Sequence, residues 1–180
     1  MYKQGHFGLG LLSTSLFALT IAELGYLTWV PLIALAGIAG GMLPDIDNKP
    51  LIPFKHHGWT HTVVFGFLAS GIITGLLLAG FYSTQQILSA TPLALPAVSI
   101  FEYILLSAIL YLSSLFGIFS HLFGDALSTA GGTLLIKPWR PVSENYVRFG
   151  VATAGDPYLN TGFFVVGAVS HGAIYYVYLL

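Results

Sequence analysis

Two residues near position 120 have the types and the spacing of a metal-binding pair. His121 and Asp125 are four residues apart in a long apolar stretch, and side chains at this spacing share one face of a helix, one turn apart. The alternative is an ion pair at a helix end. Ionisable groups are costly in an apolar segment and are usually functional there, so the pair favours a metal site.

Other ligand types occur in one loop. Asp45 and Asp47 follow Pro44, and three histidines come shortly afterwards, at positions 56, 57 and 61. If the following helix starts early, His57 and His61 share its face. If the helix begins at Gly58, the first and last of the three histidines can meet across a turn. His6, close to the start of the chain, is a further candidate ligand.

Each of these groups also has an ordinary structural interpretation. His6 alone is typical of an interfacial histidine, the two aspartates could cap a turn or face water, and the first two histidines of the loop could be solvated. Their convergence on one membrane face favours ligation, because several independent explanations would otherwise have to coincide. Asp45, Asp47 and Asp125 are therefore candidate catalytic carboxylates as well as candidate ligands.

The chain contains no cysteine, so any metal must be held by nitrogen and oxygen atoms. Zinc accepts such a donor set and is the first expectation for the cofactor, with manganese and iron as alternatives.

The composition identifies the elements that must position these residues. Of 180 residues only 7% are charged, with 6 basic and 7 acidic side chains, and the mean hydropathy is +0.82. Soluble domains carry about 25% charged residues, so lipid must solvate much of this surface. The length suits one domain, residues 1–180. The net charge is near zero and there is no basic run, so nucleic acid is not expected as a partner.

The sequence predicts an all-α membrane protein with about five transmembrane helices, since a span needs roughly 20 mostly apolar residues. The expected spans are 6–24, 27–43, 61–82, 102–127 and 162–180. Residues 87–100 are apolar but short and contain two prolines, so we expect a loop or an interfacial segment there. Glycines inside the spans, such as Gly37, Gly40, Gly41, Gly71 and Gly75, are interpreted as packing positions.

Five spans place all basic residues on one side of the membrane: Lys3, Lys49, Lys55, Lys137, Arg140 and Arg148. Basic residues favour the cytoplasmic side. We therefore expect a cytoplasmic N-terminus, an outer C-terminus, and a metal site at the cytoplasmic ends of the helices. His171 lies near the middle of the last span, where a neutral histidine hydrogen-bonded to another helix is expected.

Four segments resemble the YdjM-like inner-membrane metal-dependent hydrolases: Pro44-Asp45-Ile46-Asp47, His56-His57-Gly58-Trp59-Thr60-His61-Thr62, Ser120-His121-Leu122-Phe123-Gly124-Asp125 and the glycine-rich segment 130–135. An early Gly5-His6 pair adds to them. The resemblance implies a metal-binding set of His6, Asp45, Asp47, His56, His61, His121 and Asp125. It departs from the family pattern at Asn48, where histidine is usual, and at His57, where arginine is usual. Asp156 is the nearest match to a late family glutamate.

That family is in turn distantly similar to the zinc-dependent phospholipase C and single-strand nuclease superfamily. The resemblance implies a metal-dependent hydrolase of phosphoesters, acting on a lipid-linked substrate at the cytoplasmic interface, with membrane lipid as partner. Asp45 or Asp47 would accept the proton of the attacking water, and Lys137, Arg140 or Arg148 would hold phosphate charge. The alternative is a non-enzymatic metal-binding membrane protein with a transport or regulatory role.

Overall fold

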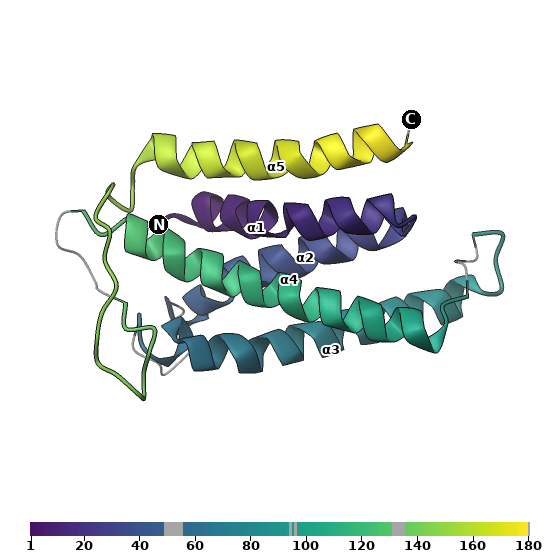
Figure 1. The fold of residues 1–180 in the computed structure, drawn as a ribbon, viewed down its shortest axis with the longest axis horizontal. Helices are drawn as coiled ribbons and strands as arrows, with labels where there is room; N and C mark the ends of the chain where they lie inside the picture. Colours follow the sequence, from purple (N-terminus) through teal and green to yellow (C-terminus); the bar gives the residue numbers. More distant parts are fainter. Residues whose placement is uncertain (49–55, 94, 96, 131–135, 180) are drawn as a thin grey trace.

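The computed structural model describes residues 1–48, 56–93, 95, 97–130 and 136–179. Five helices run back and forth along one axis (Figure 1): α1 (Lys3–Glu23), α2 (Val30–Met42), α3 (Val63–Leu88), α4 (Ile100–Leu127) and α5 (Pro157–Leu179). Short 3-10 segments precede or follow them: η1 (Leu27–Trp29), η2 (Pro44–Asn48) and η3 (Trp59–His61). The described residues include no β-strand, and the prediction of an all-α fold is confirmed.

Local sequence signals set the helix boundaries. Gly25 has a φ of +88° and reverses the chain between α1 and η1, a conformation that glycine adopts without strain. The Thr62 side chain accepts a hydrogen bond from the backbone N–H of Phe65 and starts α3. Ser99 and Glu102 form a reciprocal capping box at the start of α4, which stops the helix from extending into the preceding loop.

Four of the five predicted spans, α1, α3, α4 and α5, are long and apolar enough to cross a membrane. The second is a shorter apolar helix, because η1 occupies its first predicted residues and Pro44 begins a 3-10 turn. Its 13 residues rise about 20 Å, less than the roughly 30 Å hydrocarbon core. The expected bounds, 27–43, agree to within one residue with the apolar helical stretch Leu27–Met42, but this stretch is shorter than a candidate span.

The loop predicted at 87–100 begins after Leu88 and ends before Ile100, with residues 94 and 96 outside the described residues. The glycine-rich segment of the family resemblance also lies mostly outside them, at 131–135.

Glycines let the helix backbones approach closely. A Cβ added to Gly37 would lie 2.5 Å from the carbonyl oxygen of Gly10 on α1, and a Cβ on Gly117 would lie 2.4 Å from the carbonyl oxygen of Gly37. These distances confirm the packing interpretation for α2. The same interpretation was wrong for Gly71 and Gly75 on α3, where an added Cβ would meet nothing within 4 Å, because these positions face outward.

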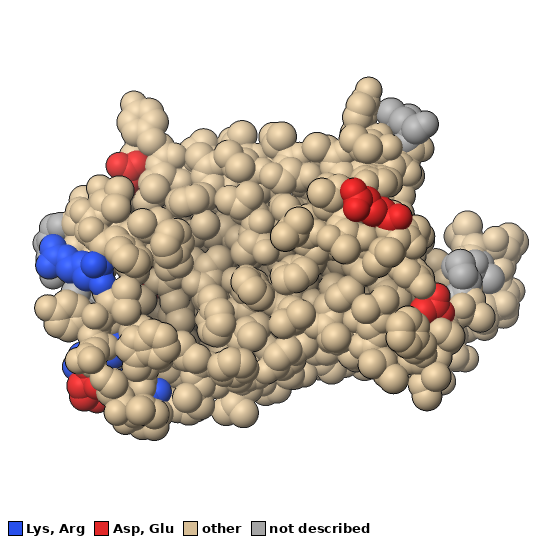
Figure 2. Space-filling view, in the orientation of Figure 1, with Lys and Arg blue, Asp and Glu red and all other residues tan. Residues whose placement is uncertain are grey.

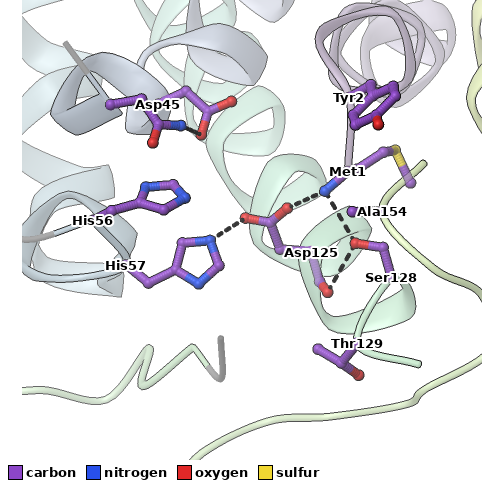
Figure 3. Close-up of a pocket in the computed structure, with 10 residues that line it drawn as sticks. Met1, Tyr2, Asp45, His56, His57, Asp125, Ser128, Thr129 and Ala154 are labelled. Carbon is purple, nitrogen blue, oxygen red and sulfur yellow. Dashed lines mark hydrogen bonds and ion pairs between the residues drawn. The ribbon is translucent and has the colours of Figure 1, made fainter. Parts of the chain in front are cut away.

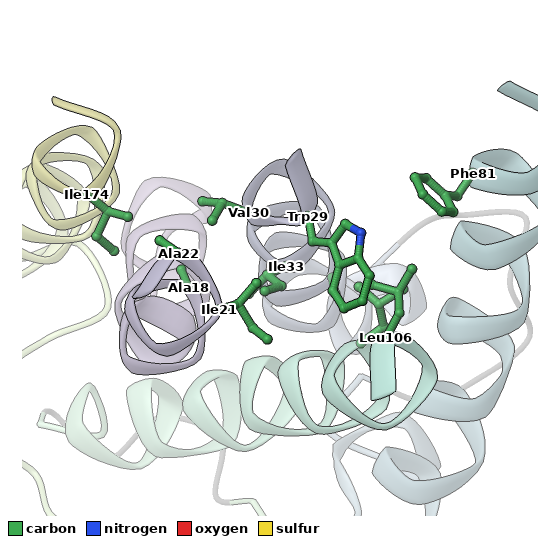
Figure 4. Close-up of a cluster of buried hydrophobic side chains, with 11 residues drawn as sticks. Ala18, Ile21, Ala22, Trp29, Val30, Ile33, Phe81, Leu106 and Ile174 are labelled. Atoms are coloured by element: carbon green, nitrogen blue, oxygen red, sulfur yellow. The ribbon is translucent and has the colours of Figure 1, made fainter. Parts of the chain in front are cut away.

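The two ends of the bundle differ in chemistry. Figure 2 shows charged side chains at the two ends of the visible face, with uncharged residues between them, as expected for a surface that faces lipid. At the end that carries the C-terminus, Trp29, Ile33 and Leu106 belong to an apolar core that joins α1, α2, α3, α4 and α5 (Figure 4). The ligand-type side chains occupy the opposite end.

Candidate metal centre

Four helical segments bring the ligand-type side chains together. His121 and Asp125 lie on the last two turns of α4 and are both buried, and His61 ends η3 just before α3. Asp45 lies on η2, directly after α2, and His6 lies in the first turn of α1. Since all these segments end on one side of the bundle, residues far apart in the sequence meet there.

Three donor atoms form the centre of this cluster. His61 Nε2 lies 3.2 Å from His121 Nε2, and Asp125 Oδ2 lies 3.4 Å from the former and 3.2 Å from the latter. Ligand atoms held about 2.0–2.1 Å from one tetrahedral ion lie about 3.3–3.4 Å apart. The three atoms therefore already have the mutual spacing of three ligands on one zinc-sized ion.

Hydrogen bonds on the far side of each ring fix how the two imidazoles face this point. His121 Nδ1 donates to the carbonyl oxygen of Gly41 at 2.8 Å. His61 Nδ1 lies 3.0 Å from Thr60 Oγ1 and 3.3 Å from Asp47 Oδ2. These two acceptors favour the tautomer of His61 that carries its proton on Nδ1. Both Nε2 atoms are thus left with lone pairs, which is the tautomer that ligates a metal.

This convergence of lone pairs could hold a cation. Asp125 Oδ2 is buried and has no hydrogen-bond partner among the described residues, although Nε2 atoms of His57, His61 and His121 lie within 3.6 Å of it. A buried carboxylate oxygen without a donor is costly, and facing acceptor atoms repel one another. A divalent ion bound among them would satisfy all of these atoms together.

Asp45 links the cluster to open space. Its Oδ1 lies 3.8 Å from His121 Nε2 and 4.0 Å from His61 Nε2, and its carboxylate lines a cavity of about 200 Å³. Asp125, His56 and His57 also line this cavity, together with Ser128 (Figure 3). The two carboxylates therefore connect the buried donor atoms to a space that a small group can enter.

His6 approaches the other oxygen of the central carboxylate. Its Nε2 lies 3.2 Å from Asp125 Oδ1, and its ring stacks on His121 with centroids 3.7 Å apart. Neither ring nitrogen of His6 has a hydrogen-bond partner among the described residues, and the side chain is buried. The α-amino group of Met1 donates to the same Oδ1 at 2.8 Å (Figure 3).

Asp47 is enclosed by its partners. Its Oδ1 accepts from His56 Nδ1 at 2.9 Å, and its Oδ2 accepts from Thr60. Burial raises the pKa of Asp47, but the hydrogen bonds from Thr60 and His56 outweigh it and hold the pKa below its usual value. Asp47 Oδ2 lies 3.3 Å from His61 Nδ1, so this carboxylate orients the His61 ring, as carboxylates behind a ligating histidine do at metal sites.

His57 is the residue to which sequence reasoning assigned no role. Its Nε2 lies 3.6 Å from Asp125 Oδ2, and burial, followed by the neighbouring His61, lowers its pKa to about 4. Its φ of +57° is unusual for a residue other than glycine. α3 begins at Val63, after all three histidines, so neither of the two helix starts considered for this segment occurs. Its position beside His56 was the available signal.

All seven predicted ligands lie in this cluster, and four groups have ligand atoms within 4.8 Å of one another: His6, His121 and Asp125; Asp45, His61 and His121; His56, His57 and His61; Asp45, Asp47 and His56. Other predicted residues lie elsewhere. Asp156 caps α5, since its Oδ1 accepts from the backbone N–H of Leu159 at 2.8 Å. Lys137, Arg140 and Arg148 do not line the cavity.

His171 is confirmed as a buried histidine that bonds to another helix. Its Nε2 lies 3.1 Å from the carbonyl oxygen of Leu11 and 3.3 Å from Thr14 Oγ1, both on α1.

Because these bonds are separate from the cluster, His171→Ala should leave bound metal unchanged. Metal content of the purified variant, compared with the parent protein by elemental analysis, checks this. A variant that inserts normally but loses its metal would show that the cluster depends on the middle of α5.

The fold and the cluster define a class of protein: a multi-pass helical membrane protein with a buried His/Asp group at one end that could hold a metal ion. The family model of the YdjM inner membrane proteins matches residues 1–180, and the chain belongs to this family. No curated protein and no solved structure matches the chain.

Proposed function

We propose that this protein is a metal-dependent hydrolase of phosphoesters, with a lipid-linked substrate reached at the cytoplasmic interface. The observation that carries the proposal is the mutual spacing of 3.2–3.4 Å among His61 Nε2, His121 Nε2 and Asp125 Oδ2. These atoms are buried, and Asp125 also lines the cavity beside Asp45. The distant similarity of the motifs to the zinc-dependent phospholipase C superfamily, which also has an H-x-x-x-D pair, supports phosphoester chemistry.

Zinc is the proposed ion, because two imidazoles and a carboxylate at this spacing suit its short bonds and tetrahedral geometry. Manganese and iron accept the same donors. A bound ion would polarise a phosphoryl oxygen and lower the pKa of bound water to about 7.

The residues of the chain then have distinct roles. Asp45, whose side chain is 17% exposed, borders the cavity and would accept the proton of the attacking water. Asp47 has a fully buried side chain, so it would hold His61 rather than take a proton from water. Asn48, Ser128 and Thr129 line the same cavity. The Asn48 amide donates one N–H to Asp45 and would donate its second N–H to a substrate oxygen.

Asp45→Asn should separate catalysis from metal binding. The amide cannot accept the proton, so we expect kcat to fall about 10²- to 10⁴-fold, the usual contribution of a general base. Metal should remain bound, since His61, His121 and Asp125 are untouched. Metal content and kcat of the same preparation provide the test. If Asp45→Asn loses as much metal as His121→Ala does, Asp45 is a ligand and not the general base.

The proposed activity is tested by metal analysis of the purified protein together with a hydrolysis screen over phospholipids and generic phosphodiesters. We expect tightly bound zinc and hydrolysis of at least one phosphoester class, abolished by a chelator and restored by zinc. Bound metal without any hydrolysis across the screen would favour the second candidate function.

The second candidate is a non-enzymatic metal site with a structural or regulatory role. The positions of Asp45 Oδ1, 3.8 and 4.0 Å from the two Nε2 atoms, favour it specifically. A small movement would make Asp45 a fourth ligand, and closed four-fold coordination is typical of structural zinc. Spectroscopy of a metal-loaded sample in the presence of phosphate separates the two, because only an open site would bind the anion.

We also propose that the metal end of the bundle faces the cytoplasm. Lys3, Lys137, Arg140 and Arg148 are the described basic residues, and basic side chains gather at the N-terminal end (Figure 2). Lys49 and Lys55 lie outside the described residues. A basic excess on one side of the membrane favours the cytoplasm.

Reporter fusions check this orientation. A reporter that is active only outside the cytoplasm should be active when it is fused after Leu180. A reporter that is active only in the cytoplasm should be active when it is inserted at Ser143, in the loop between α4 and α5. Reversed activity at both positions would move the metal site to the outer face.

A further inference from the structure

A second cavity lies between the start of α3 and the loop that follows α4. It has a volume of about 510 Å³, and its walls are mainly apolar, with Val63, Val64 and Trp139 among them. Arg140 contributes a cationic side chain to the same wall. This groove is separate from the cavity beside Asp45, and no residue lines both.

The groove has a defined backbone frame. The backbone N–H of Val63 donates to the carbonyl oxygen of Pro138 at 2.8 Å, which ties the loop to the first turn of α3. Ile136 is buried against Leu122 and Ala126 of α4, and its carbonyl oxygen accepts from the backbone N–H of Val147 at 3.1 Å. The loop is therefore fixed to both α3 and α4.

The apolar wall continues onto the outward side of α3. Val64 is 37% exposed, and Leu68, one turn further along, is 60% exposed. Within the groove, Trp139 is 52% exposed and Val142 is 89% exposed. Since α3 is a candidate membrane span, this surface faces acyl chains. Tryptophan at the end of a span is typical of the lipid headgroup region.

Basic charge lies where a headgroup would be. Lys137 and Arg140 both bind Glu144, with Lys137 Nζ and Arg140 Nε each 2.8 Å from a carboxylate oxygen. Two cations share one carboxylate that is 66% exposed, so the group keeps a net positive charge. Exposed ion pairs of this kind are weak, and Glu144 can give up a partner to a stronger anion.

We propose that the groove binds one anionic phospholipid of the surrounding bilayer, with its phosphate at Arg140 and Lys137 and an acyl chain along Val64 and Val142. A bilayer lipid is the occupant that the groove favours, because the groove opens onto the lipid-facing side of α3 and ends in basic charge. Anionic headgroups are attracted to basic residues at the membrane surface. This proposal is independent of the hydrolase proposal, since the groove shares no residue with the metal cluster.

The test is a lipid-retention measurement. The full-length protein is reconstituted into vesicles of equimolar phosphatidylglycerol and phosphatidylcholine, extracted in mild detergent, and its retained lipids are quantified by native mass spectrometry. The parent protein should retain phosphatidylglycerol in preference to phosphatidylcholine. Arg140→Gln should reduce the retained phosphatidylglycerol about fivefold, as expected from losing one basic contact at the surface.

Arg148→Gln is the matched control, because it removes the same charge from an exposed position outside the groove, and it should leave retention unchanged. Val142→Asp, at an exposed position, should lower retention while keeping both basic residues. Equal losses in Arg140→Gln and Arg148→Gln would show diffuse charge attraction and overturn the proposal. Equal retention of the two lipids by the parent protein would overturn it as well.

Discussion

Alanine at His121 or at Asp125 should lower the affinity for zinc more than about 100-fold, beyond the 10–100-fold typical of outer-shell changes. Each substitution removes one of the three atoms that lie 3.2–3.4 Å apart. Asp125→Ala should have the larger effect, because this carboxylate also contacts His6 and His57. Calorimetric titration of the metal-free protein with zinc measures the affinity.

His171→Ala is the matched control for these variants, as it removes a buried histidine that contacts only α1 in the described bonds. Membrane insertion should be normal in all three, since each substitution replaces a polar side chain of a span by alanine and leaves that span at least as apolar. The contradicting result is a zinc affinity within about threefold of the parent in both cluster variants. This change is smaller than the 10–100-fold typical of residues that only support a ligand, and it would mean that His121 and Asp125 form only an ion pair at a helix end.

Gly167→Ala on α5 should destabilise the bundle strongly. The added Cβ would lie 2.3 Å from the carbonyl oxygen of Gly8 on α1, so the two helices must separate. Overpacking of this kind costs about 1–3 kcal/mol or more, which corresponds to a decrease in the thermal midpoint of about 2–12 °C for a chain of this length. Thermal unfolding in detergent, followed by circular dichroism, measures the change.

Gly172→Ala on the same helix is the control. A Cβ there would meet nothing within 4 Å, and alanine favours a helix over glycine, so its thermal midpoint should stay equal or rise slightly. Equal decreases for both variants would argue against close contact between α1 and α5.

The convergence of the His and Asp side chains was predictable because these residues lie at helix ends. The spacing of His121 and Asp125 fixes their common face on a helix, and alternation of the spans brings His6 and Asp45 to the same side. The roles of Asp45 and Asp47 were not predictable, since they depend on the 3-10 turn of η2. That turn directs Asp47 towards Thr60 and leaves Asp45 at the cavity.

Helix lengths were harder to predict than helix positions. Hydropathy does not distinguish η1 from the first turn of α2, because both are apolar, and so the short α2 was missed. Likewise, Gly37 and Gly71 are both glycines within apolar helices, but only the first faces another backbone. Which side of a nearly uniform apolar helix packs inward depends on its neighbours and cannot be read from its own residues.

X-ray absorption at the zinc edge of the zinc-loaded protein tests most directly whether His61, His121 and Asp125 form a metal centre. We expect two imidazole nitrogens and at least one carboxylate oxygen at about 2.0–2.1 Å. One imidazole should disappear in His61→Ala and one in His121→Ala. A spectrum with oxygen ligands alone, or one that neither substitution changes, would contradict a metal centre built on His61, His121 and Asp125.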